Sequence, residues 1–444
     1  MSISQEALFK IALNLEDPWY IKLIDFSVEG KQLDVHVDFD SGSKFPCAKC
    51  GKPECSVHDT IERTWRHLNF FQFKTYIHCR VPRTECKDCG VKQVKVPWSR
   101  KGSGFTLLMD SMIVLMAQHM TVTAIAEMID EHDTRIWRVL EYYVGDARSN
   151  EDFSEVKSVG VDETSRAKGH KYVSVFIDLD KSKVVHVCEG RDASTIESFK
   201  NDLQQHKGSS ENINNFCCDM SPAFISGIEN SFPNASITFD KFHVMKLMNE
   251  ALDKVRREEQ SHNVLLKKTR YLWLKNPENL TIKQNETFGS LKNLRLKTLK
   301  AYSIKLALRD FWNQDQHSAE GYLKRWYFWA THSRLNPVID CAKTIKKHWN
   351  GVTNYIKTKI SNGILEGTNS LIQAAKDSAR GFRSTKNFII TIYLRTGKLE
   401  SIYPYETARS RFTQCVICKI QTTVVFYIGF CNQGGDIIEK GENS

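Results

Sequence analysis

The chain has 444 residues, of which 41% are hydrophobic and 26% charged, the composition of an ordinary globular protein with roughly three domains at about 150 residues each. Its first twenty residues lack a basic start, and its longest apolar stretch, VVFYIGF, is far too short to span a bilayer, so we expect neither a secretion signal nor a membrane anchor. The formal net charge of +10 is compatible with a polyanionic partner but does not establish one.

Residues 1–45 are predicted to be rich in β structure. The stretch WYIKLIDFSVEGKQLDVHVDFD holds two runs of alternating apolar and polar residues on either side of Glu29-Gly30-Lys31. Two such runs around a glycine-containing turn are typical of a β-hairpin. We therefore expect this part of the chain to form a strand, a turn and a second strand.

Two Cys-x-x-Cys pairs follow. Because the chain has thirteen cysteines and no expected secretion signal, we expect reduced thiols, and the paired spacing then favours a metal over disulfides. Four thiolates can hold one Zn²⁺ in a tetrahedron, and the 35 residues between the pairs can form a β excursion. The predicted ligands are Cys47, Cys50, Cys86 and Cys89. They predict a zinc ribbon, with buried free thiols as the alternative.

From about residue 104 the apolar residues recur every three to four positions, which predicts helices. The stretch MTVTAIAEMIDEHDTRIWRVLEYYV fits a helix-turn-helix, with Thr123 capping the first helix and Asp133 the second. Arg135 and Arg138 would then lie on the outer face of the second helix, where a recognition helix meets the major groove of DNA. An ordinary helical hairpin has the same pattern, but the position directly after a zinc ribbon favours DNA binding.

Residues 156–240 alternate short strands with helical stretches, which predicts an α/β domain with a mixed sheet. Residues 243–360 show almost no strand signal and combine Lys and Arg clusters with five tryptophans. We expect most of these tryptophans in a helical core, and a basic face that contacts DNA. The predicted DNA-contacting residues of this face are Lys267, Lys268 and Arg270.

Three acids stand out by their positions. Asp162 closes the first strand of the α/β segment, Asp219 closes a later apolar run, and Glu366 lies near the start of a helix after the helical insertion. A solvated strand end is the simpler interpretation of any one of them. Their order in a mixed α/β segment, however, is that of an RNase H-like catalytic domain, in which three carboxylates hold two Mg²⁺ or Mn²⁺ ions about 4 Å apart.

Together these motifs resemble the ISL3 family of insertion-sequence transposases, which carry a DDE catalytic triad. The matching stretches run from the cysteine pairs through VGVDETSRAKGHKYVSVFIDLD, CCDMSPAFISGI and FDKFHVMK to SNGILEGTNSLIQAAKDSARGFR. The resemblance implies that Asp162, Asp219 and Glu366 are the catalytic acids, whereas FDKFHVMK, with Asp240 and His243, is expected to stabilise a strand end or contact DNA. After about Lys398 the sequence departs from the family, and the pair Cys415 and Cys418 is interpreted as incidental.

The expected fold is multidomain: a β-rich N-terminal segment with a zinc ribbon, a helix-turn-helix, and an α/β RNase H-like catalytic domain interrupted by a helical insertion. The expected ranges are 1–100 for the β segment and ribbon, 101–150 for the helix-turn-helix, 151–242 and 361–400 for the catalytic domain, 243–360 for the insertion, and 401–444 for an irregular tail.

The resemblance implies a DNA transposase of the bacterial cytoplasm, associated with the nucleoid. It would bind terminal inverted repeats and target DNA as a homo-oligomer, cleave DNA with Mg²⁺ or Mn²⁺, and transfer the cut strand. A catalytically inactive DNA-binding regulator derived from such an enzyme is the main alternative, and a host RNase H-like nuclease is a second.

Overall fold

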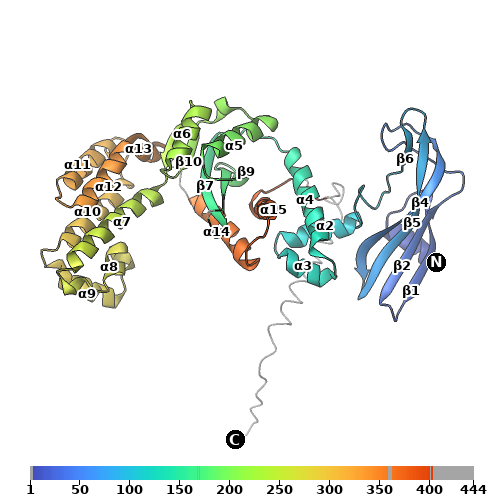
Figure 1. Cartoon of the computed structure of the whole chain (residues 1–444), viewed down its shortest axis with the longest axis horizontal. Coiled ribbons are helices and arrows are strands. Elements are labelled where there is room, and N and C mark those ends of the chain that lie inside the picture. The colour runs from blue at the N-terminus through green and yellow to red at the C-terminus, as the bar shows by residue number, and fades with distance from the viewer. Residues whose placement is uncertain (1–3, 168, 170, 359–362, 401, 404–444) are drawn as a thin grey trace, which may run out of the picture. The chain divides into compact units, whose positions relative to one another are not determined.

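The computed structural model describes residues 4–167, 169, 171–358, 363–400 and 402–403, which fall into two compact units. The described residues up to Ala147, together with Glu400, Ile402 and Tyr403, form the first unit, and Arg148–Leu399 form the second (Figure 1). Cys415 and Cys418 lie outside the described residues. Across the described ranges, no helix combines the length and the apolar content that crossing a bilayer requires.

The first unit opens with a helix that the sequence analysis missed. Helix α1 (Gln5–Ala12) lies inside the segment predicted to be β-rich, and the Ser4 hydroxyl caps it by accepting the Ala7 N–H at 3.2 Å. The predicted hairpin follows as antiparallel strands β1 (Trp19–Ser27) and β2 (Gln32–Phe39). The β-hairpin prediction is therefore confirmed, but it applies only from Trp19 onward.

A long hairpin fills the gap between the two cysteine pairs. Its strands, β4 (Cys55–Phe70) and β5 (Phe73–Cys86), are antiparallel, and β5 also pairs in parallel with β2. Short strands β3 (Lys44–Phe45) and β6 (Gly90–Gln93) flank the cysteine pairs. The resulting order β1-β2-β5-β4-β3, with β6 on β5, joins the N-terminal hairpin and the predicted zinc ribbon in one six-stranded sheet.

Three helices complete the main part of this unit: α2 (Leu107–Ala117), α3 (Val122–Ile129) and α4 (Asp133–Ser149). The predicted core residues Ile125 and Ile136 are fully buried. The cap of α3 is Thr121, which accepts the Ala124 N–H at 3.2 Å, so the prediction of Thr123 was wrong by two residues. The helix pair begins and ends close to where the apolar periodicity placed it.

The second unit contains the predicted mixed sheet. Strands β7 (Ser158–Ala167), β8 (Lys171–Asp178) and β9 (Lys183–Glu189) are antiparallel, whereas β10 (Asn215–Cys218) and β11 (Ser236–Phe239) run parallel to β7. The strand order is β11-β10-β7-β8-β9, which confirms the predicted mixed sheet. Helices α5 (Ala193–Gln205) and α6 (Pro222–Ser231) pack together, while α14 (Gly363–Ser378) packs on β7 and α15 (Thr385–Thr396) on β9 (Figure 1).

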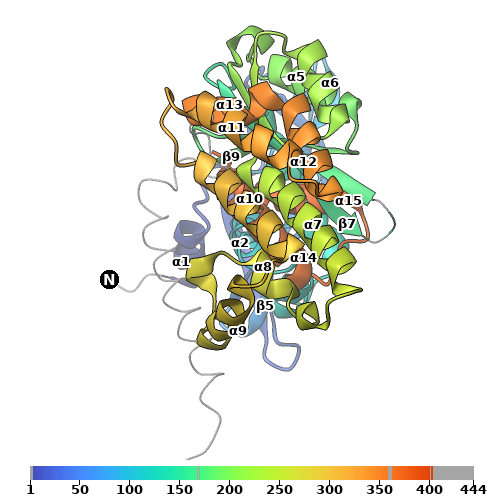
Figure 2. The same ribbon diagram turned by 90° about the vertical axis from the view of Figure 1, so that its left-hand side faces the viewer.

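The helical insertion separates β11 from α14. It consists of α7 (Lys241–Gln260), α8 (Arg270–Leu274), α9 (Ile282–Lys292), α10 (Lys297–Phe311), α11 (Ala319–Thr331), α12 (Asn336–Lys347) and α13 (Trp349–Thr358). Figure 2 shows α10 and α12 beside the long helix α7, against which both pack. Trp273, Trp312 and Trp326 are buried in this bundle, whereas Trp329 is exposed, which confirms that most of these tryptophans are core residues.

Candidate active site and DNA-binding elements

The four predicted cysteines form a compact cluster. Their Sγ atoms all lie within 4.8 Å of one another, and within the described part of the chain they are the one group of three or more His, Cys, Asp or Glu side chains that could hold a single ion. The Sγ atoms of Cys50 and Cys86 are 3.7 Å apart. A tetrahedral zinc with Zn–S bonds of about 2.3 Å separates its sulfurs by about 3.8 Å. The cluster therefore fits a zinc ion.

The backbone around the cysteine pairs explains this geometry. Gly51 and Gly90 each follow the second cysteine of a pair and adopt left-handed φ angles of 75° and 69°, which glycine adopts without steric cost. The backbone N–H groups of Cys50 and Lys49 point at the Cys47 sulfur and lower the pKa of Cys47 to about 6. Thiolate is the form that binds zinc, so this turn prepares Cys47 as a ligand.

The two arginines of the helix-turn-helix differ in their surroundings. The Arg135 guanidinium pairs with Glu131, donates to the Gly104 carbonyl at 3.1 Å and stacks 4.2 Å over the Phe105 ring. Arg138, one turn further along α4, is exposed. Arg135 is therefore engaged within the protein, and of the two predicted DNA contacts Arg138 is the one that α4 presents to solvent.

The register of the mixed sheet places two of the predicted acids side by side. Gly160 of β7 pairs with Cys217 of β10 in parallel register. Asp162 and Asp219 each lie two residues beyond these partners, so they are equivalent in the register. Asp219 directly follows β10 as predicted, but the prediction that Asp162 closes its strand was wrong, because β7 continues to Ala167 in its pairing with β8. Both are partly buried. The carboxyl ends of parallel strands meet at one edge of a sheet, which is where α/β proteins place their sites.

The electrostatics of Asp162 favour a bound cation. Burial raises the pKa of this carboxyl, and the negative charge of Asp219 raises it further, although the Glu163 N–H, His243 and Asn369 act in the opposite direction. The Glu163 N–H donates to Oδ1 at 2.8 Å, and the Asn369 amide donates to Oδ2 at 2.6 Å. Two neighbouring carboxylates that repel each other in a poorly solvated place are a good site for a divalent cation.

Glu366 lies in the first turn of α14 and is exposed. Its neighbour Leu365 is buried against Gly160 of β7, and Asn369, one turn further along α14, donates to Asp162. Helix α14 is thus docked at the strand that carries Asp162. Among the residues that the structure describes, however, the three acids do not approach closely enough to share one ion, and residues 359–362 before α14 lie outside this set.

Sequence reasoning missed Asn369, the side chain that bonds to Asp162. The signal was available, since Asn369 follows Glu366 by three residues in a predicted helix and therefore lies on the same helical face. Nothing in the sequence alone, however, indicated that this face of α14 meets β7 at Asp162.

Asp240 and His243 form a pair beside these acids. Asp240 follows β11, whose Phe239 pairs with Cys218, so it stands next to Asp219 in the register. Its side chain is only 3% exposed, and both of its oxygens are occupied. Oδ1 accepts the Phe242 N–H at 2.8 Å and caps α7, while Oδ2 lies 2.7 Å from Nδ1 of His243. Asp240 thus has a structural role where β11 ends and α7 begins, one of the two roles expected from the sequence, and DNA contact by this motif stays a prediction.

The three basic residues predicted in the insertion are all exposed. Lys267 and Lys268 follow a short 3-10 turn (Val264–Leu266), and Arg270 begins α8. Arg270 lies 3.5 Å from Asp253 of α7, and Lys268 adopts a left-handed φ of 61°. Their side chains are accessible to a phosphate backbone, so DNA contact stays a prediction for all three.

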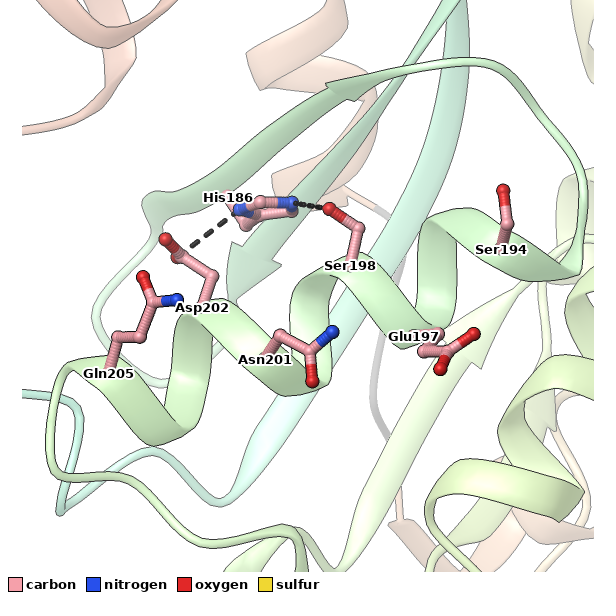
Figure 3. Close-up of a pocket in the computed structure, with 7 residues that line it drawn as sticks. All are labelled: His186, Ser194, Glu197, Ser198, Asn201, Asp202 and Gln205. Atoms are coloured by element: carbon pink, nitrogen blue, oxygen red, sulfur yellow. Dashed lines mark hydrogen bonds and ion pairs between the residues drawn. The ribbon is translucent and has the colours of Figure 1, made fainter.

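A separate polar hollow of about 390 Å³ lies along α5 (Figure 3). Its lining residues are His186, Ser194, Glu197, Ser198, Asn201, Asp202 and Gln205. The Ser198 hydroxyl lies 3.0 Å from Nε2 of His186, and Nδ1 of the same ring lies 3.2 Å from Asp202, an order that resembles a nucleophile, base and acid. Asp202 is also bound to Arg148 at 2.8 Å. We assign Ser198, His186 and Asp202 a structural role in fixing α5 on β9, because the charge of Asp202 is balanced by Arg148 within the protein.

Comparisons with known proteins agree with this arrangement. A family model for the DDE domain of ISL3 elements, described as a transposase, matches residues 159–392. A model for the helix-turn-helix domain of transposase family ISL3 matches residues 94–144, and one for the zinc finger of the transposases of IS204, IS1001, IS1096 and IS1165 matches residues 43–89.

Two curated relatives are similar over most of their length. The chain is 25% identical over 417 residues to the transposase for insertion sequence element IS1557 of Mycobacterium tuberculosis, covering 86% of this chain and 93% of the relative. It is also 25% identical over 356 residues to the transposase for IS1001 of Bordetella parapertussis, covering 78% and 87%. With its cysteine cluster, helix-turn-helix and mixed sheet in this order along the sequence, the chain belongs to the ISL3 family of insertion-sequence transposases.

Proposed function

We propose that this transposase binds the terminal inverted repeats of its element, cleaves DNA there with Mg²⁺ or Mn²⁺, and joins the freed 3′-hydroxyl to target DNA. The observation that carries the proposal is the sheet register that sets Asp162 and Asp219 at equivalent positions on neighbouring strands. The docking of α14, with Glu366 in its first turn, on the same strand supports it.

The three acids would divide the work of holding two cations. Asp162 would bridge both, Asp219 would complete one site and Glu366 the other, because hard carboxylate oxygens suit Mg²⁺ and Mn²⁺. When bound, the cations would supply Lewis-acid chemistry for activating the attacking oxygen and stabilising the leaving one. The chain itself contributes a partly buried carboxylate pair, in which charge interactions are stronger than in bulk water. The Glu163 N–H and the Asn369 amide hold Asp162, and the Ser221 N–H donates to Asp219 at 2.9 Å.

DNA recognition would be divided between the two units. The helix-turn-helix and the zinc ribbon would bind the terminal repeats, with the exposed Arg138 at the groove and Arg135 holding α4 to the Gly104 carbonyl. Lys267, Lys268 and Arg270 would neutralise phosphates. Because two element ends must be cut and joined, we propose that two or more copies assemble on DNA, at the nucleoid.

The test starts from the DNA that flanks the gene. Purified protein is incubated with labelled duplexes that carry the flanking inverted repeats or a scrambled repeat, with Mg²⁺ and a target plasmid. The proposal expects cuts at the repeat boundary and joined products only from the true repeat. Binding without any cutting would favour the inactive regulator, and cutting that ignores the repeat would favour a general nuclease.

A further inference from the structure

Within the described residues, the amide group of Asn369 makes a hydrogen bond through its nitrogen but none through its oxygen. Its Nδ2 lies 2.6 Å from Oδ2 of Asp162. Its Oδ1 is buried and has no hydrogen-bond partner among the residues that the structure describes. An ionised carboxylate only accepts hydrogen bonds, so the amide nitrogen must be the atom that faces Asp162, and the oxygen must be the atom left over.

A buried acceptor without a partner is costly, by about 1–3 kcal/mol, and native proteins rarely keep one without a reason. Swapping the amide oxygen and nitrogen does not remove the cost here, because it would set an oxygen against the Asp162 carboxylate. What is missing is therefore a positively polarised group beside Oδ1. The amide belongs to a side chain already bonded to the proposed bridging carboxylate, so a cation at that site, or its hydration shell, meets this need.

The position on the helix supports the same conclusion. Asn369 follows Glu366 by three residues, so both project from the same face of α14. The backbone of this helix is fixed to β7 by Leu365 against Gly160 and by Lys376, whose ammonium donates to the Ser165 carbonyl at 2.6 Å. The side chain thus stands on a rigid element at the edge that holds the acids.

We infer that Asn369 is a positioning residue of the cation site, whose amide N–H holds Asp162 in its binding orientation and whose Oδ1 receives the cation or its hydration shell. This inference rests on the proposed function, because it takes Asp162 as a ligand. Removing a side chain that orients a metal ligand typically lowers metal affinity by about 10–100-fold.

The test measures Mn²⁺ binding by the full-length protein in the absence of DNA, from the electron paramagnetic resonance signal of free Mn²⁺. Asn369→Leu keeps the approximate volume but removes both polar atoms, and Asn369→Ala is a second variant in case the first packs poorly. Gln373→Ala is the matched control, because Gln373 is an exposed amide one turn further along α14 that donates to Asp377 at 2.8 Å. Asp162→Asn reports on the proposed site itself.

We expect Asn369→Leu and Asn369→Ala to weaken Mn²⁺ binding about 10-fold or more, with cooperative thermal unfolding retained and terminal-repeat binding unchanged. Gln373→Ala should bind Mn²⁺ as the unaltered protein does. If Asp162→Asn weakens binding but both Asn369 variants stay within about twofold, the inference is wrong and the proposed function stands. If Asp162→Asn has no effect, the proposed site is wrong as well. An equal loss in Gln373→Ala would also overturn the inference, since it would assign the effect to α14 in general.

Discussion

The close packing of α14 on β7 can be tested at Gly160. A β-carbon added there would lie 2.9 Å from Cδ2 of Leu179, 2.9 Å from Cδ2 of Leu365 and 3.1 Å from its Cδ1. All three distances are shorter than an ordinary carbon–carbon contact of about 3.5–4.0 Å. Gly160→Ala must therefore push two leucine side chains aside, and one of them precedes Glu366.

Overpacking of this kind costs about 1–3 kcal/mol, and we expect Gly160→Ala to lower the free energy of unfolding by about 2 kcal/mol. The larger effect should be on the rate of DNA cleavage. A displacement of α14 moves Glu366 and Asn369 away from Asp162, and a misplacement of about 1 Å can reduce a rate about 100-fold. Cleavage of a terminal-repeat duplex should therefore fall much more than binding to it.

The assay combines denaturant unfolding with cleavage and gel-shift measurements on the full chain. Gly289→Ala in α9 is the control, because its β-carbon position is open and a glycine-to-alanine change inside a helix stabilises it by about 0.5–1 kcal/mol. Adding Leu365→Ala to Gly160→Ala should restore room, so the two losses should not add. Unfolding and cleavage as in the unaltered protein would show that α14 does not pack on β7 in solution.

Three further outcomes follow from the first unit. Metal analysis should find about one zinc per chain. Cys50→Ser should lose the zinc and weaken repeat binding, because a structural zinc contributes folding energy. Zinc retained by this variant would contradict the ligand assignment. Burial and the charge of Arg66 lower the pKa of His67 to about 4. An unfolded histidine titrates near about 6.5, so stability should be lost as the pH falls from about 6.5 to 4, by about 3 kcal/mol in all. His67→Gln should flatten this dependence of thermal unfolding on pH, and an equally steep profile would exclude His67 as its cause. Arg138→Ala should weaken repeat binding by about 1–3 kcal/mol in a gel shift if it reads a base, without a change in the unfolding temperature, whereas Arg135→Ala should lower that temperature; the reverse pattern would exchange their roles.

Local patterns in the sequence predicted the local structure well. The alternating runs around Glu29-Gly30-Lys31 became β1 and β2, and the two cysteine pairs came together as predicted. Asp219 could be placed at a strand end because it follows a short apolar run, and it is the residue after β10. Asp162 could not, because the polar residues after it continue β7 as far as Ala167.

What depended on contacts between distant segments could not be predicted. The bond from Asn369 to Asp162 joins positions 207 residues apart, and no periodicity in α14 indicates which helical face meets the sheet. Arg135 donates to the Gly104 carbonyl, which belongs to the loop before α2. The sequence does not indicate that this loop meets α4, so the hydrogen bond could not be predicted. Helix α1 was missed because its eight residues are too few for a clear periodic signal.

The most direct test of the account is DNA cleavage in Mg²⁺ by variants of the three acids. Asp162→Asn, Asp219→Asn and Glu366→Gln keep the approximate side-chain shape and remove the charge, and Asp180→Asn, at an exposed position just after β8, is the matched control. The account predicts that each of the three substitutions abolishes cutting and strand transfer while terminal-repeat binding persists. Asp180→Asn should leave cutting, strand transfer and repeat binding intact. A variant at any of the three positions that still cuts DNA at the repeat boundary would contradict the assignment of that acid.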